Sequence, residues 1–245
     1  MSADVLSAWT TDARIALYYA PPSSSAWWRA GCEWLGRDAE SGDSIEPPLE
    51  PSLNALGHTV TSLTEAPRRY GWHGTLVAPF RTADAVTPLQ VLSVAREWAS
   101  RTACFDTPMQ AVEMGRFVAL RAELAADDEA IRKLATSALH ALAPLRAPPL
   151  PEDTARRLAS NLSPRQGALL LKWGYPYVLD EFRFHMTLSD SLDTAPARAA
   201  IVSLWEARSA ALGPLPFHGA ALFVQTHPGA PFIIWQRLPF AGGPA

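Results

Sequence analysis

The sequence of 245 residues predicts a fold that mixes helices with strands and repeats one order of elements in its two halves. Patterns typical of strands and of helices alternate along the chain. The order strand, helix, strand with His, helix, strand pair runs to residue 124, and after a helical insert it resumes from the strand with His. The motif aromatic-His-x-Thr-Leu marks this repeat, because it occurs at residues 72–76 and again at residues 184–188.

The first half begins with a strand and a helix. The apolar run Ile15–Pro22 predicts a strand that ends at its prolines, and residues 23–38 predict a short helix with serines as caps. Residues 40–66 contain several prolines and predict a long irregular connection. The strand that carries His73 follows and stops at Pro79.

A capping box with proline at the first helical position, residues 87–90, begins the next helix. We expect this helix to run to about Arg101 and to bury Leu89, Leu92 and Trp98. Residues 109–124 predict two strands that turn near glycine 115, and residues 127–142 predict an amphipathic helix.

The second half follows a segment rich in proline and arginine at residues 144–162. A second capping box at residues 163–166 begins a helix that stops at Gly174. The strand with His185 comes next, then a helix over about residues 196–212. Two strands, near residues 220–225 and 232–238, complete the order.

Side-chain alternation divides each His strand into two faces. In the second strand the core side is Phe182, Phe184, Met186 and Leu188, and the opposite side is Arg183, His185, Thr187 and Ser189. In the first strand the core side is Tyr70, Trp72 and Leu76, and the opposite side is Arg69, His73 and Thr75. We therefore expect both strands to present an Arg, a His and a Thr to a shared surface.

An Arg, a His and a Thr on each of two strands suit the cleavage of a phosphodiester. One His can take a proton from the attacking water or hydroxyl group, and the other can give a proton to the leaving oxygen. Each Thr hydroxyl can donate to a phosphate oxygen, and each Arg supplies charge and planar donors. Such a site needs neither a metal ion nor a cofactor.

The sequence around both motifs resembles a known superfamily. The segments that carry the resemblance are ALYYAP, WLGRD, RRYGWHGTL with APF, SPRQ, KWGYPYVLDEFRFHMTL and ALFV. From about Ile15 to Leu238 the chain is similar to the two-histidine (2H) phosphoesterases, which include RNA 2′,5′-ligase-like proteins and cyclic nucleotide phosphodiesterases. The flanks resemble in particular a subfamily encoded beside phosphonate-utilisation (carbon–phosphorus lyase) genes.

The resemblance implies a bilobal α+β fold, in which two pseudo-symmetric antiparallel sheets face a central cleft and the helices lie outside. We expect a loose leader at residues 1–13 and one catalytic domain at residues 14–240. One lobe takes residues 14–125 with His73, the other takes residues 175–240 with His185, and a helical insert takes residues 144–174.

The resemblance also implies roles for residues of the two motifs. His73 and His185 are the acid and the base, and Thr75 and Thr187 hold the phosphate. The subfamily usually has a lysine directly after the first His-x-Thr-Leu, where this chain has Val77. By alternation Val77 lies on the cleft face, so a cation is expected to be missing there.

Four further residues are expected to bind the substrate, each with a structural alternative. Arg69 and Arg183 share the faces of the two histidines, and the alternative is that they are rim charges. Tyr18 and Phe223 are expected to line the cleft and stack on a base or a sugar, and the alternative is that they belong to the core. The other four histidines have no partner pattern and are expected at the surface.

Composition limits the partners. The net charge of −3 gives no overall basic field for long nucleic acid. Two cysteines, Cys32 and Cys104, predict reduced cytosolic thiols, and no secretory signal or membrane-length apolar stretch occurs in the sequence. We expect a cytoplasmic monomer without a metal ion, acting on a small phosphorylated substrate.

The predicted function is therefore that of a metal-independent phosphoesterase or cyclic phosphodiesterase. It would act on a small sugar or nucleotide phosphoester, with a role in phosphonate metabolism. The alternative is a binding protein that holds a phosphorylated small molecule or an RNA end without turning it over. A metallohydrolase is disfavoured because the chain has no HExxH motif and no Cys/His ligand spacing. The sequence leaves open the substrate, the reaction direction and which His is the base.

Overall fold

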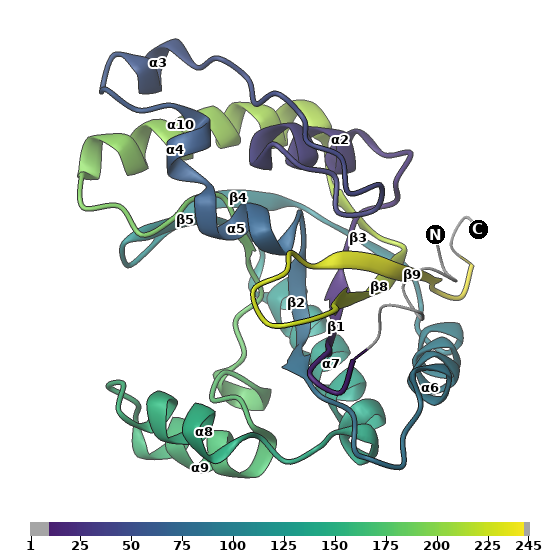
Figure 1. Cartoon of the computed structure of the whole chain (residues 1–245). Coiled ribbons are helices and arrows are strands. Elements are labelled where there is room, and N and C mark those ends of the chain that lie inside the picture. The colour runs from purple at the N-terminus through teal and green to yellow at the C-terminus, as the bar shows by residue number, and fades with distance from the viewer. Residues whose placement is uncertain (1–9, 243–245) are drawn as a thin grey trace.

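The computed structural model describes residues 10–242 and has an α+β fold (Figure 1). Seven strands form one antiparallel sheet in the order β4-β5-β6-β2-β1-β8-β9, and β3 pairs with β7 in a small second sheet. The predicted fold class and the antiparallel sheets are thus confirmed. The predicted leader falls largely on residues 1–9, which lie outside the described part.

The large sheet is built from strands of very different length. Its members are β1 (Arg14–Tyr19), β2 (Gly74–Phe80), β4 (Met109–Met114), β5 (Phe117–Ala122), β6 (Met186–Thr187), β8 (Gly219–Gln225) and β9 (Ile233–Pro239). The small sheet contains β3 (Phe105–Thr107) and β7 (Leu215–Phe217).

The helices lie around the large sheet. They are α2 (Ala26–Leu35), α3 (Pro51–Asn54), α4 (Val60–Leu63), α5 (Glu65–Tyr70), α6 (Pro88–Ser100), α7 (Ala125–Leu142), α8 (Pro151–Leu158), α9 (Pro164–Trp173) and α10 (Ala195–Leu212). Two 3-10 turns, η1 (Ala143–Leu145) and η2 (Leu179–Glu181), complete the chain. Figure 1 shows α2 and α10 over one end of the sheet, and α8 with α9 at the other end. Among the described helices, none is long and apolar enough to cross a membrane.

Strands from the two halves of the chain are interleaved in the large sheet. The hairpin β4–β5 of the first half lies beside β6, and the hairpin β8–β9 of the second half lies beside β1. The strands that follow the two histidines, β2 and β6, pair directly with each other. The expectation of two equivalent sheets facing one another is therefore not met. Pairing β2 with β6 joins the two halves, and it removes two strand edges that would otherwise be exposed.

Local capping signals place three helices as predicted. The side chain of Ser25 caps α2, and capping boxes at Thr87 and Ser163 begin α6 and α9. Helix α6 buries Leu92 and Trp98 as expected, but Leu89 is exposed. The buried stripe of α6 runs through Val91, Ala95 and Trp98, and Leu89 in the first turn lies outside it, so the prediction for this residue was wrong.

The segment before the first motif is helical rather than extended. Helices α3 and α4 lie within the expected irregular connection of residues 40–66, and α5 takes up Arg69 and Tyr70. The carboxylate of Asp190 accepts hydrogen bonds from the backbone N–H of Glu65 at 2.8 Å and of Ala66 at 3.0 Å. This cap comes from a residue 125 positions later in the chain, so local sequence did not reveal it. Tyr70, predicted on the core side, is consequently partly exposed.

Tryptophan side chains contact both motifs on their buried side. Trp72 stacks on Trp205 with ring centroids 5.3 Å apart, and Trp34 meets Trp205 edge-on at 5.6 Å. The indole N–H of Trp34 donates to the carbonyl of Leu188 at 2.7 Å. Because Trp72 is the first residue of one motif and Leu188 the last of the other, this cluster fixes both segments in one core.

Candidate active site

The two motifs meet in antiparallel register. Gly74 lies opposite Met186, so His73 is placed opposite Thr187 and Thr75 opposite His185. Residues directly opposite each other project from the same sheet face. All four side chains line one cavity of about 290 Å³. The structure therefore brings together the four residues that were predicted to be catalytic.

A small residue between His73 and Thr75 allows this pairing. A side-chain Cβ at Gly74 would lie 2.3 Å from the ring of Phe184, which is fully buried beneath the sheet. Phe184 is one of the four apolar residues predicted on the core side of the second motif, and all four are buried. Gly74 thus lets β2 approach the ring that supports the second motif.

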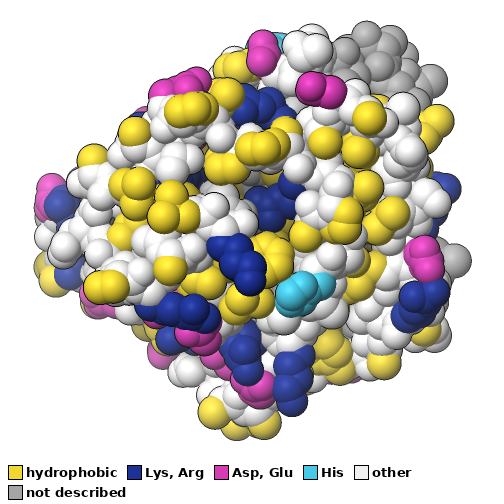
Figure 2. All heavy atoms as spheres, turned by 90° about the horizontal axis from the view of Figure 1, so that it is seen from below, with side chains coloured by type: hydrophobic (Ala, Val, Ile, Leu, Met, Phe, Trp, Pro, Cys, Tyr) yellow, Lys and Arg dark blue, Asp and Glu magenta, His cyan; other side chains and the backbone are white. Residues whose placement is uncertain are grey.

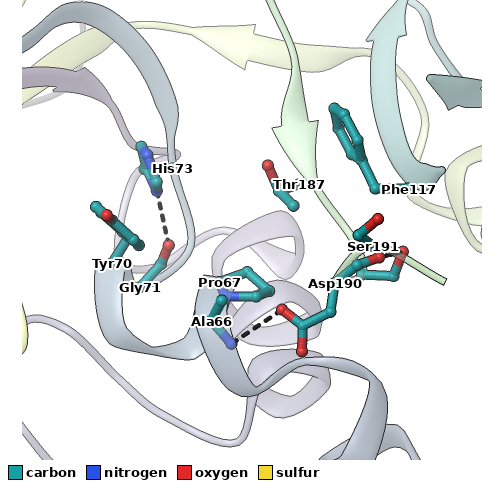
Figure 3. A pocket seen from close by; sticks show the side chains of 10 residues that line it. Ala66, Pro67, Tyr70, Gly71, His73, Phe117, Thr187, Asp190 and Ser191 are labelled. Atoms are coloured by element: carbon teal, nitrogen blue, oxygen red, sulfur yellow. Dashed lines mark hydrogen bonds between the residues drawn. The ribbon is translucent and has the colours of Figure 1, made fainter. Parts of the chain in front are cut away.

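Both histidines are oriented in the same way by the backbone. Nδ1 of His73 lies 2.8 Å from the carbonyl oxygen of Gly71, and Nδ1 of His185 lies 3.0 Å from that of Arg183. A carbonyl can only accept, so each Nδ1 carries the hydrogen and each Nε2, on the far side of the ring, is left for the cavity. The hydroxyl of Thr75 lies 3.5 Å from Nε2 of His73. Figure 3 shows His73 and Thr187 reaching one pocket from neighbouring segments.

Aromatic rings hold His73 from the side. The ring of Tyr18 stacks on His73 with centroids 3.9 Å apart, and Tyr18 also lines the cavity. The ring centroid of Phe223 lies 5.0 Å from that of Tyr18, and Phe223 is completely buried. Phe223 therefore has no surface to offer a base or a sugar, contrary to the expectation that it stacks on a ligand. Its ring supports Tyr18, which in turn fixes His73.

Burial favours the neutral form of both histidines. It lowers the pKa of His73 to about 4, although the hydrogen bond to Gly71 acts the other way. Burial also lowers the pKa of His185, and the positive charge of Arg121 acts in the same direction. Both rings are therefore neutral near pH 7 while the cavity holds no anion. A bound phosphate would favour protonation of one of them, because an opposite charge nearby stabilises the cation.

The two arginines predicted beside the histidines do not line this cavity. Arg69 lies in α5, and its guanidinium donates to the carbonyl of Gly229 at 2.7 Å. Arg183 is exposed and donates to the carbonyls of Asp180 and Phe182 at 2.8 and 2.7 Å. The alternation argument placed both on extended strands, but β2 begins only at residue 74 and β6 only at residue 186.

Two other arginines line the cavity instead, and they were not predicted from the sequence. Arg14 and Arg157 line the cavity with the histidines. Arg14 is four residues before Tyr18 on the same strand face, so alternation could have identified it. Arg157 comes from α8 in the helical insert and carries no such signal. Arg121 lies opposite His185 by the β5–β6 register, where alternation along β5 could have placed it, but it pairs with Asp128 and does not line the cavity.

Val77 does not face the cavity. Tyr18 pairs with Thr75, but its neighbour Leu17 pairs with Val77, so β2 contains an extra residue at this point. This bulge turns Val77 to the face of Leu17, where it is almost fully buried. Ala78 lines the cavity in its place. The expectation that a cation is missing at Val77 was wrong, because alternation fails across a bulge.

A second cavity of about 310 Å³ continues from His73 and Thr187 (Figure 3). Its walls include apolar groups of Ala66, Pro67 and Phe117. The ring of Phe117 also lies 5.8 Å from that of His185. The cleft can therefore hold an anionic group at the histidines and a less polar part of a ligand beside it.

Within residues 10–242, no group of three His, Cys, Asp or Glu side chains is placed to hold a metal ion. The donors that do converge on the cavity are imidazole nitrogens, threonine hydroxyls and guanidinium groups. These groups suit an anion, with two titratable rings beside it.

Comparisons with known proteins give a family and two relatives. The profile of a family described as "Protein of unknown function (DUF1045)" matches residues 75–233, which include His185 and begin two residues after His73. A protein of Janthinobacterium sp. (strain Marseille), named "Ribose 1,5-bisphosphate phosphokinase PhnN", is 36% identical over 236 residues, which is 94% of this chain and 51% of that protein. A protein of the same name from Laribacter hongkongensis (strain HLHK9) is 36% identical over 230 residues, 91% of this chain and 52% of its own length. The chain thus spans about half the length of the curated relatives it matches.

Proposed function

We propose that this chain, which belongs to the DUF1045 family, is a phosphoesterase, because two His–Thr pairs face one cavity. It opens a cyclic phosphodiester on a small sugar or nucleotide by general acid–base catalysis. The observation that carries the proposal is the antiparallel register that sets His73 against Thr187 and Thr75 against His185. Both rings are held by Nδ1 and keep Nε2 for the cavity.

In the proposed reaction the phosphate lies between the two histidines, and the hydroxyls of Thr75 and Thr187 donate to its non-bridging oxygens. Nε2 of one His takes a proton from water as the water oxygen bonds to phosphorus. The opposite P–O bond breaks, and the leaving oxygen takes a proton from Nε2 of the other His. The products are a phosphomonoester and the freed hydroxyl group. We assign His73 as the base, since burial favours its neutral form.

The name of the relatives favours a second candidate, phosphoryl transfer to a ribose phosphate. A P-loop kinase needs GxxxxGK[ST] to hold nucleotide phosphates, and this sequence does not contain it. The chain matches only about half of each relative, so the kinase activity in their name can belong to the other half. The name nevertheless supports a phosphorylated ribose as the class of substrate. The resemblance to a subfamily encoded beside phosphonate-utilisation genes supports a role in phosphonate metabolism.

The test is turnover of a panel of cyclic phosphates, followed by phosphorus NMR in the presence of EDTA. The panel contains nucleoside 2′,3′-cyclic phosphates and ribosyl 1,2-cyclic phosphates, with and without a 5-phosphate. We expect wild type to open at least one of them, and His73→Ala and His185→Ala each to lose roughly a hundredfold to ten-thousandfold in kcat. His227→Ala, at an exposed ring, is the matched control and should keep full activity.

Three other outcomes would contradict the proposal. Turnover that needs a divalent metal would favour a metallohydrolase. ATP-dependent phosphorylation of a ribose phosphate would favour the second candidate. Tight binding of a cyclic phosphate without turnover would favour the binding-protein alternative.

The pH profile is a second test. The base must be neutral and the acid protonated in the free protein. Burial lowers the pKa of both rings below the usual value near 6.5, so the fraction with this pair of states peaks below pH 6.5. We expect kcat/KM to be bell-shaped with its maximum on the acid side of pH 6.5. A maximum above pH 7.5 would contradict this assignment.

A further inference from the structure

A small pocket lined by arginines adjoins the candidate active site, and we infer that it binds a second phosphate group on the substrate. This inference rests on the proposed function and narrows it. The substrate class becomes a cyclic phosphodiester of a pentose or nucleoside that also carries a terminal phosphate.

The pocket is dominated by positive charge. Five arginines contribute to its wall: Arg14, Arg81, Arg146, Arg156 and Arg157. The acidic residue of the lining is Asp153, and it pairs with Arg156. Within residues 10–242, the other four arginines form no ion pair with a carboxylate. Four unneutralised guanidinium groups around one hollow are costly by mutual repulsion, and a bound anion would relieve that cost.

Three of these guanidinium groups are held by few contacts, which leave most of their donors unused. Arg14 donates through Nε to the side chain of Gln225 at 2.8 Å. Arg146 donates to the carbonyl of Trp173 at 2.7 Å, and Arg157 lies over the ring of Tyr175 at 5.1 Å. A guanidinium has five N–H donors in a planar fork, which suits phosphate oxygens.

Backbone hydrogen bonds and side-chain packing hold the wall of the pocket in place. The backbone N–H of Ala147 donates to the carbonyl of Arg81 at 2.8 Å, and that of Ala83 donates to Leu145 at 3.0 Å. Arg146 is packed on the ring of Phe80 at 5.3 Å, and burial lowers its pKa. These contacts tie the end of β2 to the start of the helical insert, so the backbone of Arg81 and the side chain of Arg146 are held in place before a ligand arrives.

The arginine pocket is continuous with the cavity of the histidines. Arg14, Pro79 and Arg157 line both. Thr75 pairs with Tyr18, and Phe80 pairs with Ile15, which is three residues earlier on β1. The bulged end of β2 therefore advances roughly 10 Å from the threonine, and the arginine side chains reach part of the way back. This spacing favours two phosphates separated by a sugar over two phosphates joined directly.

The size of the pocket favours a single compact anion. Its cavity volume is about 80 Å³, against roughly 10–15 Å³ that a cavity needs to hold one water molecule. Figure 2 shows Lys and Arg side chains gathered along the middle of the face seen from below, while Asp and Glu lie mainly towards its edges. We therefore argue for a terminal phosphate and not for an extended RNA strand.

The experiment compares kcat/KM for pairs of cyclic phosphates that differ only in the terminal phosphate. We expect wild type to prefer the phosphorylated member roughly tenfold to a hundredfold, because charge-assisted hydrogen bonds form to it alone. Arg81→Gln and Arg157→Gln should each lower this ratio several-fold. Arg29→Gln, at an exposed residue of α2, is the matched control and should keep the wild-type ratio.

A binding measurement separates this inference from the proposed function. Calorimetry would compare ribose 1,5-bisphosphate with ribose 1-phosphate, which lacks only the terminal phosphate, on wild type, Arg81→Gln and Arg157→Gln. Arginine-dependent preference for the bisphosphate, with no turnover of any cyclic phosphate, would support the second-phosphate site and contradict the phosphoesterase proposal. Turnover with a ratio near one, unchanged in both arginine variants, would overturn the second-phosphate site alone. Tighter binding of a single-stranded RNA end than of either sugar would also overturn it.

Discussion

Lowering the pH should destabilise the wild-type protein more than a His73→Gln variant. Burial holds the pKa of His73 at about 4 in the folded protein, against an ordinary value near 6.5 in the unfolded chain. Between these values the unfolded chain binds more protons than the folded protein. Stability from this residue is therefore complete above pH 6.5 and is lost as the pH falls towards 4.

The size of the effect follows from the two pKa values. At pH 5 nearly every unfolded chain carries a proton on this ring, while most folded molecules do not. The resulting loss relative to pH 7.5 is about 2 kcal/mol, and it approaches about 3 kcal/mol near pH 4. Gln is uncharged at every pH, so His73→Gln removes this contribution and leaves all other titrations in place.

The assay is urea unfolding of both proteins at a series of pH values from 7.5 to 4.5. The quantity of interest is the difference in the free energy of unfolding between wild type and variant at each pH, because carboxylate titrations cancel in it. His227→Gln, at the turn between β8 and β9, is the control and should follow the wild type. If the difference between wild type and His73→Gln stayed constant from pH 7.5 to 5, the ring would not be held neutral, and its assignment as base would lose its support.

Three further changes test how the two motifs are held together. Gly74→Ala puts a Cβ against the ring of Phe184, so we expect a loss of about 1–3 kcal/mol in urea unfolding and lower activity as β2 and β6 separate. Asp190→Ala removes the cap of α5 and should cost about 1–2 kcal/mol in the same assay, with a lower thermal midpoint. Trp34→Phe leaves the buried carbonyl of Leu188 without its donor, and a loss of about 1–3 kcal/mol is expected; a loss below 0.5 kcal/mol, roughly, would mean that this bond does not hold the second motif.

Much of the local structure could be read from the sequence. Capping residues Ser25, Thr87 and Ser163 each begin a helix, because a cap involves only neighbours within one turn. The alternation around His185 predicted the buried side correctly, since four apolar residues in strict alternation leave one face for the core. The paired His-x-Thr-Leu motif identified the two segments that meet.

The register of β2 against β6 and β1 determines which residues line the cavity. The pairing of Gly74 with Met186 sets each His against the Thr of the other motif, and only the folded sheet contains that information. The bulge in β2 moved Val77 into the core, because an extra residue in one strand reverses the face of the residues that directly follow it. Arg69 does not lie on the predicted strand face, because the residues before His73 form helix α5. Asp190, two residues after the second motif, caps this helix.

The sequence by itself thus indicated the two His-x-Thr-Leu segments and the start of three helices, because those signals act within one turn or one strand. The tertiary structure alone decided which cations surround the histidines. Arg14 and Arg157 come from β1 and α8, more than a hundred residues apart, and meet because the insert packs beside the end of the sheet. Contacts between residues so far apart in the sequence depend on register and packing, which no local pattern of residues specifies.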